Sequence, residues 1–123
     1  MSLTYEKLMS LMDANKNIKE FFIIEGKPLF LGVLKELEEP IIRNGRLVTQ
    51  GILNEQCEDF GVIQRQDCLD VLKGFEISTR STLIPNESNQ NIMFDNGNFR
   101  LMVLDKPFTP NGFNIQYREY ETE

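Results

Sequence analysis

The chain has 123 residues, 41% of them hydrophobic and 26% charged, with a formal net charge of -6 and a pI near 4.7. These proportions are ordinary for a globular protein and exclude the disordered and fibrous classes. The acidic charge argues against binding to nucleic acid or to an anionic membrane, since both need clustered Lys and Arg. No apolar run reaches the ~18 residues of a membrane span, and we expect residues 1–123 to form a single domain.

An amphipathic helix is predicted near the N-terminus. Thr4 is a good N-cap, and the apolar residues that follow have the i, i+3, i+4, i+7 spacing of a helix ending near Asn15: Tyr5, Leu8, Met9 and Met12. We expect this apolar face to pack on a sheet. The alternative use of its methionines is a partner surface, which would make a homodimer through the N-terminal helix.

A first β-hairpin is predicted directly after this helix. Residues 20–25 and 28–34 are β-branched, aromatic and apolar, and Gly26-Lys27 between them suits a tight turn. Their continuous apolar runs indicate strands that are covered on much of both faces. Residues 35–39 are charged, and we interpret them as a strand end or a single helical turn.

A second hairpin is predicted across Asn44-Gly45, because both central residues of a two-residue turn need a positive φ and these two adopt it most readily. Pro40 cannot donate a hydrogen bond to a neighbouring strand and marks the strand start or a sheet edge. Gly51 interrupts the strand that follows the turn. Such a glycine indicates a bulge or a close approach of another backbone segment.

The middle of the chain is predicted to contain short helices. Asn54 can cap a short helix, Gly61 lies in a break, and residues 66–73 form a second helix that ends at Gly74 as a left-handed residue. Residues 75–84 alternate in polarity and are predicted to form a strand.

The last third predicts an antiparallel ribbon with one buried side. Residues 91–94 and 98–104 flank an Asp-Asn-Gly turn, and residues 112–120 form the final strand. The fold class is therefore α+β: an antiparallel sheet of about five to six strands, with an N-terminal helix and one or two short inserted helices. The residues expected on the buried side of the ribbon are Phe99, Leu101, Val103, Phe113, Ile115 and Tyr117.

Catalytic and metal sites are not predicted. The chain has no histidine, which removes the usual general base and metal ligand, and it carries no nucleotide, calcium or nucleophile motif. We therefore expect a protein that is not an enzyme and has no cofactor; carboxylate catalysis is the weaker alternative. Cys57 and Cys68 are too few for a zinc site, and we expect two half-buried thiols, or a disulfide in an oxidising compartment.

The arginines are the most informative polar residues. If two of them converged in a concavity with an amide or a phenol, the natural ligand would be a small carboxylate or phosphate. The alternative is that they are ordinary cross-strand partners of acidic residues. The predicted ligand-binding residues are Arg46, Gln50, Arg100 and Tyr117.

Several short segments carry a resemblance to a known family. The run Pro40-Ile41-Ile42, the pattern Gly45-x-Leu47-Val48 with Gly51 after it, and a helix followed by residues 75–84 resemble the centre of CHASE-type extracellular sensor domains of the fourth class. These PAS-like modules occur in histidine kinases and diguanylate cyclases. The segment 99–104, with Asp105, Pro107 and Arg118 after it, is similar to the closing hairpin of that family.

The resemblance implies a PAS-like fold and a ligand-sensing, non-catalytic input domain of a signal-transduction receptor, located outside the cytoplasm. A small-molecule or anionic ligand would then change the strain passed to the flanking helices, with residues 5–12 as the transmitting element. The alternative is a small self-contained protein of phage or mobile-element origin that is cytoplasmic and acts through a protein–protein interface.

Overall fold

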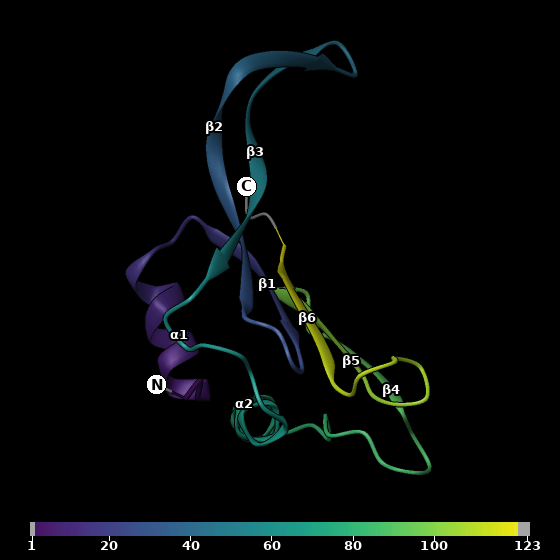
Figure 1. The fold of residues 1–123 in the computed structure, drawn as a ribbon. Coiled ribbons are helices and arrows are strands. Elements are labelled where there is room, and N and C mark those ends of the chain that lie inside the picture. The colour runs from purple at the N-terminus through teal and green to yellow at the C-terminus, as the bar shows by residue number, and fades with distance from the viewer. Residues whose placement is uncertain (1, 121–123) are drawn as a thin grey trace.

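The structure is a computed structural model that describes residues 2–120. It contains two helices and six strands, and the strands form one antiparallel sheet in the order β3-β2-β1-β6-β5-β4 (Figure 1). The predicted α+β class and the upper end of the predicted strand number are thereby confirmed. The elements are α1 (Tyr5–Ala14), β1 (Ile18–Ile24), β2 (Leu29–Arg43), β3 (Arg46–Cys57), α2 (Arg65–Thr79), β4 (Asn91–Asp95), β5 (Phe99–Leu104) and β6 (Asn114–Glu119).

Both helices pack on the same face of the sheet. The ring of Phe75 on α2 lies edge-on to Tyr5 of α1, with ring centroids 5.0 Å apart, and also contacts Phe21 of β1 and Tyr117 of β6. Phe21 and Tyr117 stack in parallel at 4.7 Å. These aromatic contacts, together with area burial, hold the helices on the sheet. The buried core on this side also includes Leu8, Ile23, Leu29, Leu31, Leu72, Leu101, Val103 and Ile115.

Several local predictions are confirmed. Thr4 caps α1, its hydroxyl accepting a hydrogen bond from the Lys7 amide at 3.1 Å. The turn between β2 and β3 has Asn44 at φ 52° and Gly45 at φ 76°, as a two-residue hairpin turn requires. In the final ribbon, Leu101 lies opposite Tyr117 on the buried face, where Phe113 and Ile115 are buried as well.

The strand predicted over residues 75–84 is wrong, because α2 continues to Thr79. Its first turn is fixed by the Gln64 amide, which donates to the Asp67 carboxylate at 2.8 Å. The left-handed residue that ends the helix is Arg80, at φ 56°, and not Gly74. Buried side chains lie along α2 at the i, i+3, i+4, i+7 spacing, a helical period that overrides the local alternation of polarity: Cys68, Val71, Leu72 and Phe75.

The short helix predicted after Asn54 is also wrong, since β3 continues through this segment to Cys57. The reason is strand pairing: Asn54 lies opposite Gly32 and Cys57 lies opposite Leu29. Residues 35–39 were predicted as a strand end or a helical turn, but they lie within β2. The two predicted hairpins therefore share this one long strand. Pro40 lies inside β2 and does not start it.

Candidate functional site

The outer part of the β2–β3 hairpin, residues 35–51, projects from the body of the protein and is called the arm from here on. It rises beyond the other strands in Figure 1. The reason is that β1 is shorter than β2: its pairing with β2 ends where Ile18 lies opposite Val33, and the Leu34 amide donates to the Asn17 carbonyl at 2.7 Å. None of the arm residues is buried. The arm therefore contributes nothing to the core.

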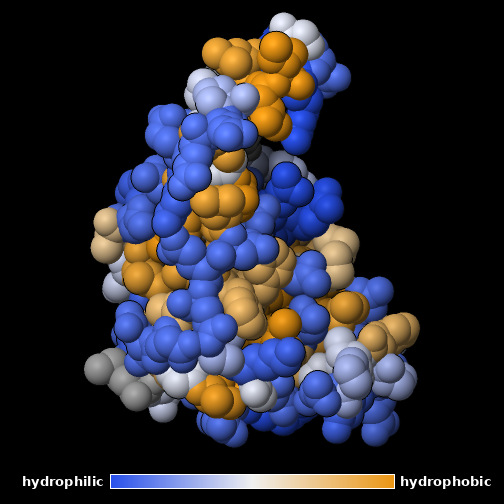
Figure 2. All heavy atoms as spheres, turned by 45° about the horizontal axis from the view of Figure 1, so that its top comes forward, coloured by the Kyte–Doolittle hydropathy of each residue, from blue (hydrophilic) through white to orange (hydrophobic). Residues whose placement is uncertain are grey.

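The tip of the arm carries large apolar side chains in contact with solvent. Ile42 is 77% exposed and Leu47, directly opposite it, is 67% exposed. Ile41 and Val48 form the neighbouring cross-strand pair, with Ile41 43% exposed. Figure 2 shows strongly hydrophobic side chains gathered at this end of the molecule. Since successive residues of a strand point to opposite faces, both faces of the tip are apolar.

A large bulge separates the tip from the base of the arm. The pairs Glu36–Gln50 and Ile41–Val48 flank it, so residues 37–40 of β2 stand opposite Thr49 alone. Such insertions bend and twist a hairpin, and they accommodate a proline that cannot join the ladder. Within the bulge, Leu37 folds over the strand and would lie 3.1 Å from a Cβ added to Gly51. The bulge lies on the neighbouring strand and not at Gly51 itself, and the close contact at Gly51 comes from the Leu37 side chain and not from another backbone segment.

Acidic residues and arginines occupy different parts of the arm, and Lys35 at its base pairs with Glu55. The acidic residues lie in or next to the bulge, whereas Arg43 and Arg46 lie at the tip, directly opposite each other beside the turn. Two like charges in that position destabilise a hairpin, so folding of the arm alone does not account for them. Arginine beside exposed apolar residues is a combination enriched in protein interfaces. The acidic residues of the arm are Glu36, Glu38 and Glu39.

The four predicted ligand-binding residues do not come together. Arg46 and Gln50 lie on β3, where the Gln50 amide donates to the Glu36 carboxylate at 3.3 Å. Arg100 lies on β5 opposite Arg118, and Tyr117 belongs to the next cross-strand pair. The side chains of Arg100 and Tyr117 therefore point to opposite faces of the sheet. Burial raises the pKa of Tyr117 well above its usual value. Ligand binding by these residues stays a prediction that this geometry does not favour.

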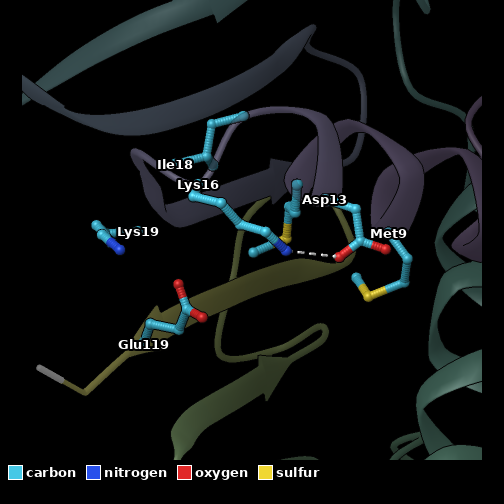
Figure 3. A pocket seen from close by; sticks show the side chains of 7 residues that line it. Met9, Asp13, Lys16, Ile18, Lys19 and Glu119 are labelled. Atoms are coloured by element: carbon cyan, nitrogen blue, oxygen red, sulfur yellow. Dashed lines mark hydrogen bonds and ion pairs between the residues drawn. The ribbon is translucent and has the colours of Figure 1, made fainter. Parts of the chain in front are cut away.

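Two surface hollows lie beside α1. The smaller, of about 170 Å³, is lined by Met9, Met12, Asp13, Lys16, Ile18, Lys19 and Glu119 (Figure 3). Two cations line it: Lys16, whose Nζ lies 3.2 Å from Asp13 Oδ1, and Lys19. A drug-sized ligand needs a cavity of roughly 300–1,000 Å³. The larger hollow, of about 750 Å³, is lined by Glu6, Lys7, Ser10, Leu11, Asp59 and Phe60. Neither hollow contains a predicted ligand-binding residue.

One polar cluster joins three distant parts of the chain. Arg65, at the start of α2, donates to Asp105 Oδ2 at 2.8 Å and to Glu25 Oε1 at 3.2 Å, and its guanidinium lies 4.2 Å from the centre of the Phe113 ring. The same Glu25 carboxylate accepts from the Phe113 amide at 3.1 Å. The Arg65 guanidinium holds the pKa of Asp105 below its usual range. Every member has a protein partner, so we interpret the cluster as a structural one that joins the start of α2 to the ends of neighbouring strands.

The thiols are free, without the disulfide considered above. Cys68 is fully buried on α2, and burial raises its pKa to about 12. Cys57 is half-buried at the end of β3, and its pKa is raised as well, mainly by burial. A thiol that stays protonated is a poor nucleophile and a poor metal ligand.

Within residues 2–120, no helix combines the length and hydrophobicity needed to cross a membrane, and no group of three or more acidic or thiol side chains is arranged to hold a metal ion. No protein-family model matches this chain, and no curated protein matches it.

Sequence reasoning identified the turn at the tip but missed the exposure of Ile42 and Leu47. A signal was present: Ile41-Ile42 and Leu47-Val48 place consecutive apolar residues on both sides of the turn. A hairpin with one face on a core buries only alternate residues, so apolar residues at consecutive positions beside a turn leave apolar side chains exposed to solvent.

Proposed function

We propose that this protein is an interaction protein whose binding element is the arm. The observation that carries the proposal is the exposed Ile42–Leu47 pair at the end of the arm, in which no residue is fully buried and β2 has no described partner strand other than β3. An apolar anchor flanked by arginines supplies the hydrophobic centre and the polar rim of a typical interface.

The arm is an unusual feature for a protein of this size. An isolated two-stranded hairpin is only marginally stable in water, and ordering each residue costs about 1–2 kcal/mol of conformational entropy. The arm has its own cross-strand pairs to offset this cost, but it buries none of its side chains fully. Contact with a partner would remove Ile42 and Leu47 from water and stabilise the arm further.

The ligand-sensing function suggested by the family resemblance remains the alternative proposal. It requires a cavity that can hold a ligand, whereas Arg46 and Gln50 lie on the arm, Arg100 lies on β5 and Tyr117 is buried in the core. A protein interface makes no such demand. For this reason the geometry supports the interaction function better.

The test is site-specific photo-crosslinking in the cells that make the protein. A photoreactive amino acid replaces Leu47 at the tip, and a matched variant carries it at Ile77, which is 80% exposed on α2, at the opposite end of the molecule from the arm (Figure 1). We expect a discrete adduct from position 47 and none of comparable yield from position 77. Equal yields at both positions, or no adduct from position 47, would contradict the proposal.

A further inference from the structure

Strand β3 forms one edge of the sheet, and its outer side faces no other strand among residues 2–120. It is 12 residues long, whereas β4 at the opposite edge has only 5 residues. A short edge strand offers little to pair with, but a long one presents a row of free backbone donors and acceptors that can pair with another strand. The two edges of the sheet therefore differ in their capacity for association.

The side chains of β3 have an internal two-fold pattern centred on Gln50. Counting outward, Val48 and Ile52 lie at two positions from the centre, and Leu47 and Leu53 lie at three. If two copies of β3 pair antiparallel with Gln50 opposite Gln50, each residue meets its equivalent on the same face of the sheet. Leu47 then contacts Leu53 of the second copy on one face, and Val48 contacts Ile52 on the other. Aliphatic cross-strand pairs of this kind stabilise a sheet.

These apolar residues are available for such contacts. Leu47 is 67% exposed, Leu53 is 46% exposed and Ile52 is 40% exposed. If the pairing shifted by one residue, side chains directly opposite each other would have to point to opposite faces of the sheet, which a two-fold dimer does not allow. If it shifted by two residues, Leu47 and Val48 would lie opposite polar residues or glycine. The pattern thus specifies one register.

The charges of β3 select the antiparallel orientation. The strand has a single cation, Arg46, near its beginning and a single anion, Glu55, near its end. Antiparallel pairing brings the arginine end of each copy beside the glutamate end of the other, whereas parallel pairing would place like charges together. The rest of the strand is uncharged. Two chains of formal charge -6 can therefore approach each other along β3 without repulsion between acidic residues of the strand.

We infer that the partner bound by the arm is a second copy of this chain, and that two β3 strands pair antiparallel about Gln50 to join two six-stranded sheets into one. The inference rests on the proposed interaction function and names its partner. The interface is isologous, since the same residues serve on both copies, which closes the assembly at two.

Disulfide trapping tests the register directly. Residues directly opposite in an antiparallel pair have Cα atoms about 4.5–5.5 Å apart, within the range that a disulfide spans. Gln50→Cys places two thiols at that separation in the dimer. Thr49→Cys is the matched control, because the two introduced thiols are then diagonal neighbours about 7–8 Å apart, too far for a disulfide. We expect mild oxidation to crosslink the Gln50→Cys variant and to leave the control and the natural chain monomeric in denaturing gels.

Sedimentation equilibrium of the natural chain and of charge variants tests the side-chain pairs. Leu47→Lys is expected to weaken the dimer by about tenfold or more, and the double variant Leu47→Lys/Leu53→Glu to recover it, because each lysine then faces a glutamate of the other copy. A monomer at concentrations up to about 1 mM, or a dimer that Gln50→Cys does not crosslink, would overturn the inference.

The two proposals can fail separately. If position 47 crosslinks to a different protein while the purified chain stays monomeric, the second copy is excluded and the interaction function stands. If the natural chain is monomeric and position 47 gives no adduct, both proposals are excluded.

Discussion

The ring of Tyr5 lies directly over Gly74, so that helix α1 meets helix α2 where α2 has no side chain. A Cβ added to Gly74 would overlap the Tyr5 ring. The contact also places Tyr5 edge-on to Phe75, with ring centroids 5.0 Å apart. A glycine inside a helix is otherwise unfavourable by about 1 kcal/mol relative to alanine, so the close approach explains its presence.

We predict that Gly74→Ala destabilises the protein by about 1–3 kcal/mol, because the clash with Tyr5 outweighs the gain in helix propensity. Urea unfolding measures the change. In a Tyr5→Ala background the same substitution is expected to be neutral or slightly stabilising, and this non-additivity identifies the contact. A similar loss of stability in both backgrounds would show that Gly74 is required for another reason.

Shortening the arm is predicted to leave the fold intact. Lys35 and Gly51 lie directly opposite each other, so an Asn-Gly turn can replace residues 36–50 and join them. Because no residue of the arm is buried, we expect the free energy of unfolding at low protein concentration to change by no more than about 1 kcal/mol. Urea unfolding and circular dichroism check this. Loss of folded structure would mean that the arm contributes to the body of the protein.

Asp105→Asn is predicted to lower the stability of the protein at neutral pH. The variant is also expected to lose less stability than the natural chain when the pH falls. The Arg65 hydrogen bond depresses the folded-state pKa of Asp105 below its ordinary value of 3.8. A depressed carboxyl pKa adds stability above the unfolded-state value, and this stability is lost as the pH falls through the folded-state value. Since the Arg65 side chain is 51% exposed, solvent screening limits the contribution to about 1 kcal/mol or less.

Urea unfolding from neutral pH down to below the ordinary carboxyl pKa measures this effect. Asp13→Asn serves as the control, because both members of the Lys16–Asp13 pair are 80% exposed and their interaction contributes little. Equal acid dependence of the natural chain and of the Asp105→Asn variant would contradict the assigned role of the Arg65–Asp105 pair.

The two thiols are predicted to differ in reactivity. Cys68 is fully buried with a pKa of about 12, so alkylation near pH 8 requires unfolding, whereas half-buried Cys57 reacts faster. Peptide mapping after brief treatment with iodoacetamide distinguishes them. A Cys57→Ser variant is expected to show no rapid modification. Rapid alkylation of Cys68 in the folded protein would show that α2 opens more readily than its packing indicates.

Local rules predicted the parts of this fold that depend on neighbouring residues. Asn44-Gly45 identified the turn of the arm, Thr4 identified the start of α1, and the alternation around Tyr117 identified its buried face. The end of α2 was not predictable in this way. Gly74 has the sequence appearance of a helix terminator, and only the approach of Tyr5 from a distant segment explains its position inside the helix.

The candidate site was predictable only in part. Arg46 and Gln50 were identified, but as members of a ligand site together with Arg100 and Tyr117, which lie on other strands. The arm depends on long-range pairing: β2 continues past the end of β1, and a bulge opposite Thr49 accommodates residues 37–40. Neither feature follows from local propensity, because both depend on where the neighbouring strands end.

Amide hydrogen exchange along β3 at low and high protein concentration shows whether the arm and its free edge form the contact with a second copy of the chain. Between about 10 μM and about 1 mM, the alternate amides of residues 46–54 that point away from β2 should exchange markedly more slowly at the higher concentration, while those of β4 do not change. Unchanged exchange along β3, or protection that appears on β4 or α1 instead, would contradict this account.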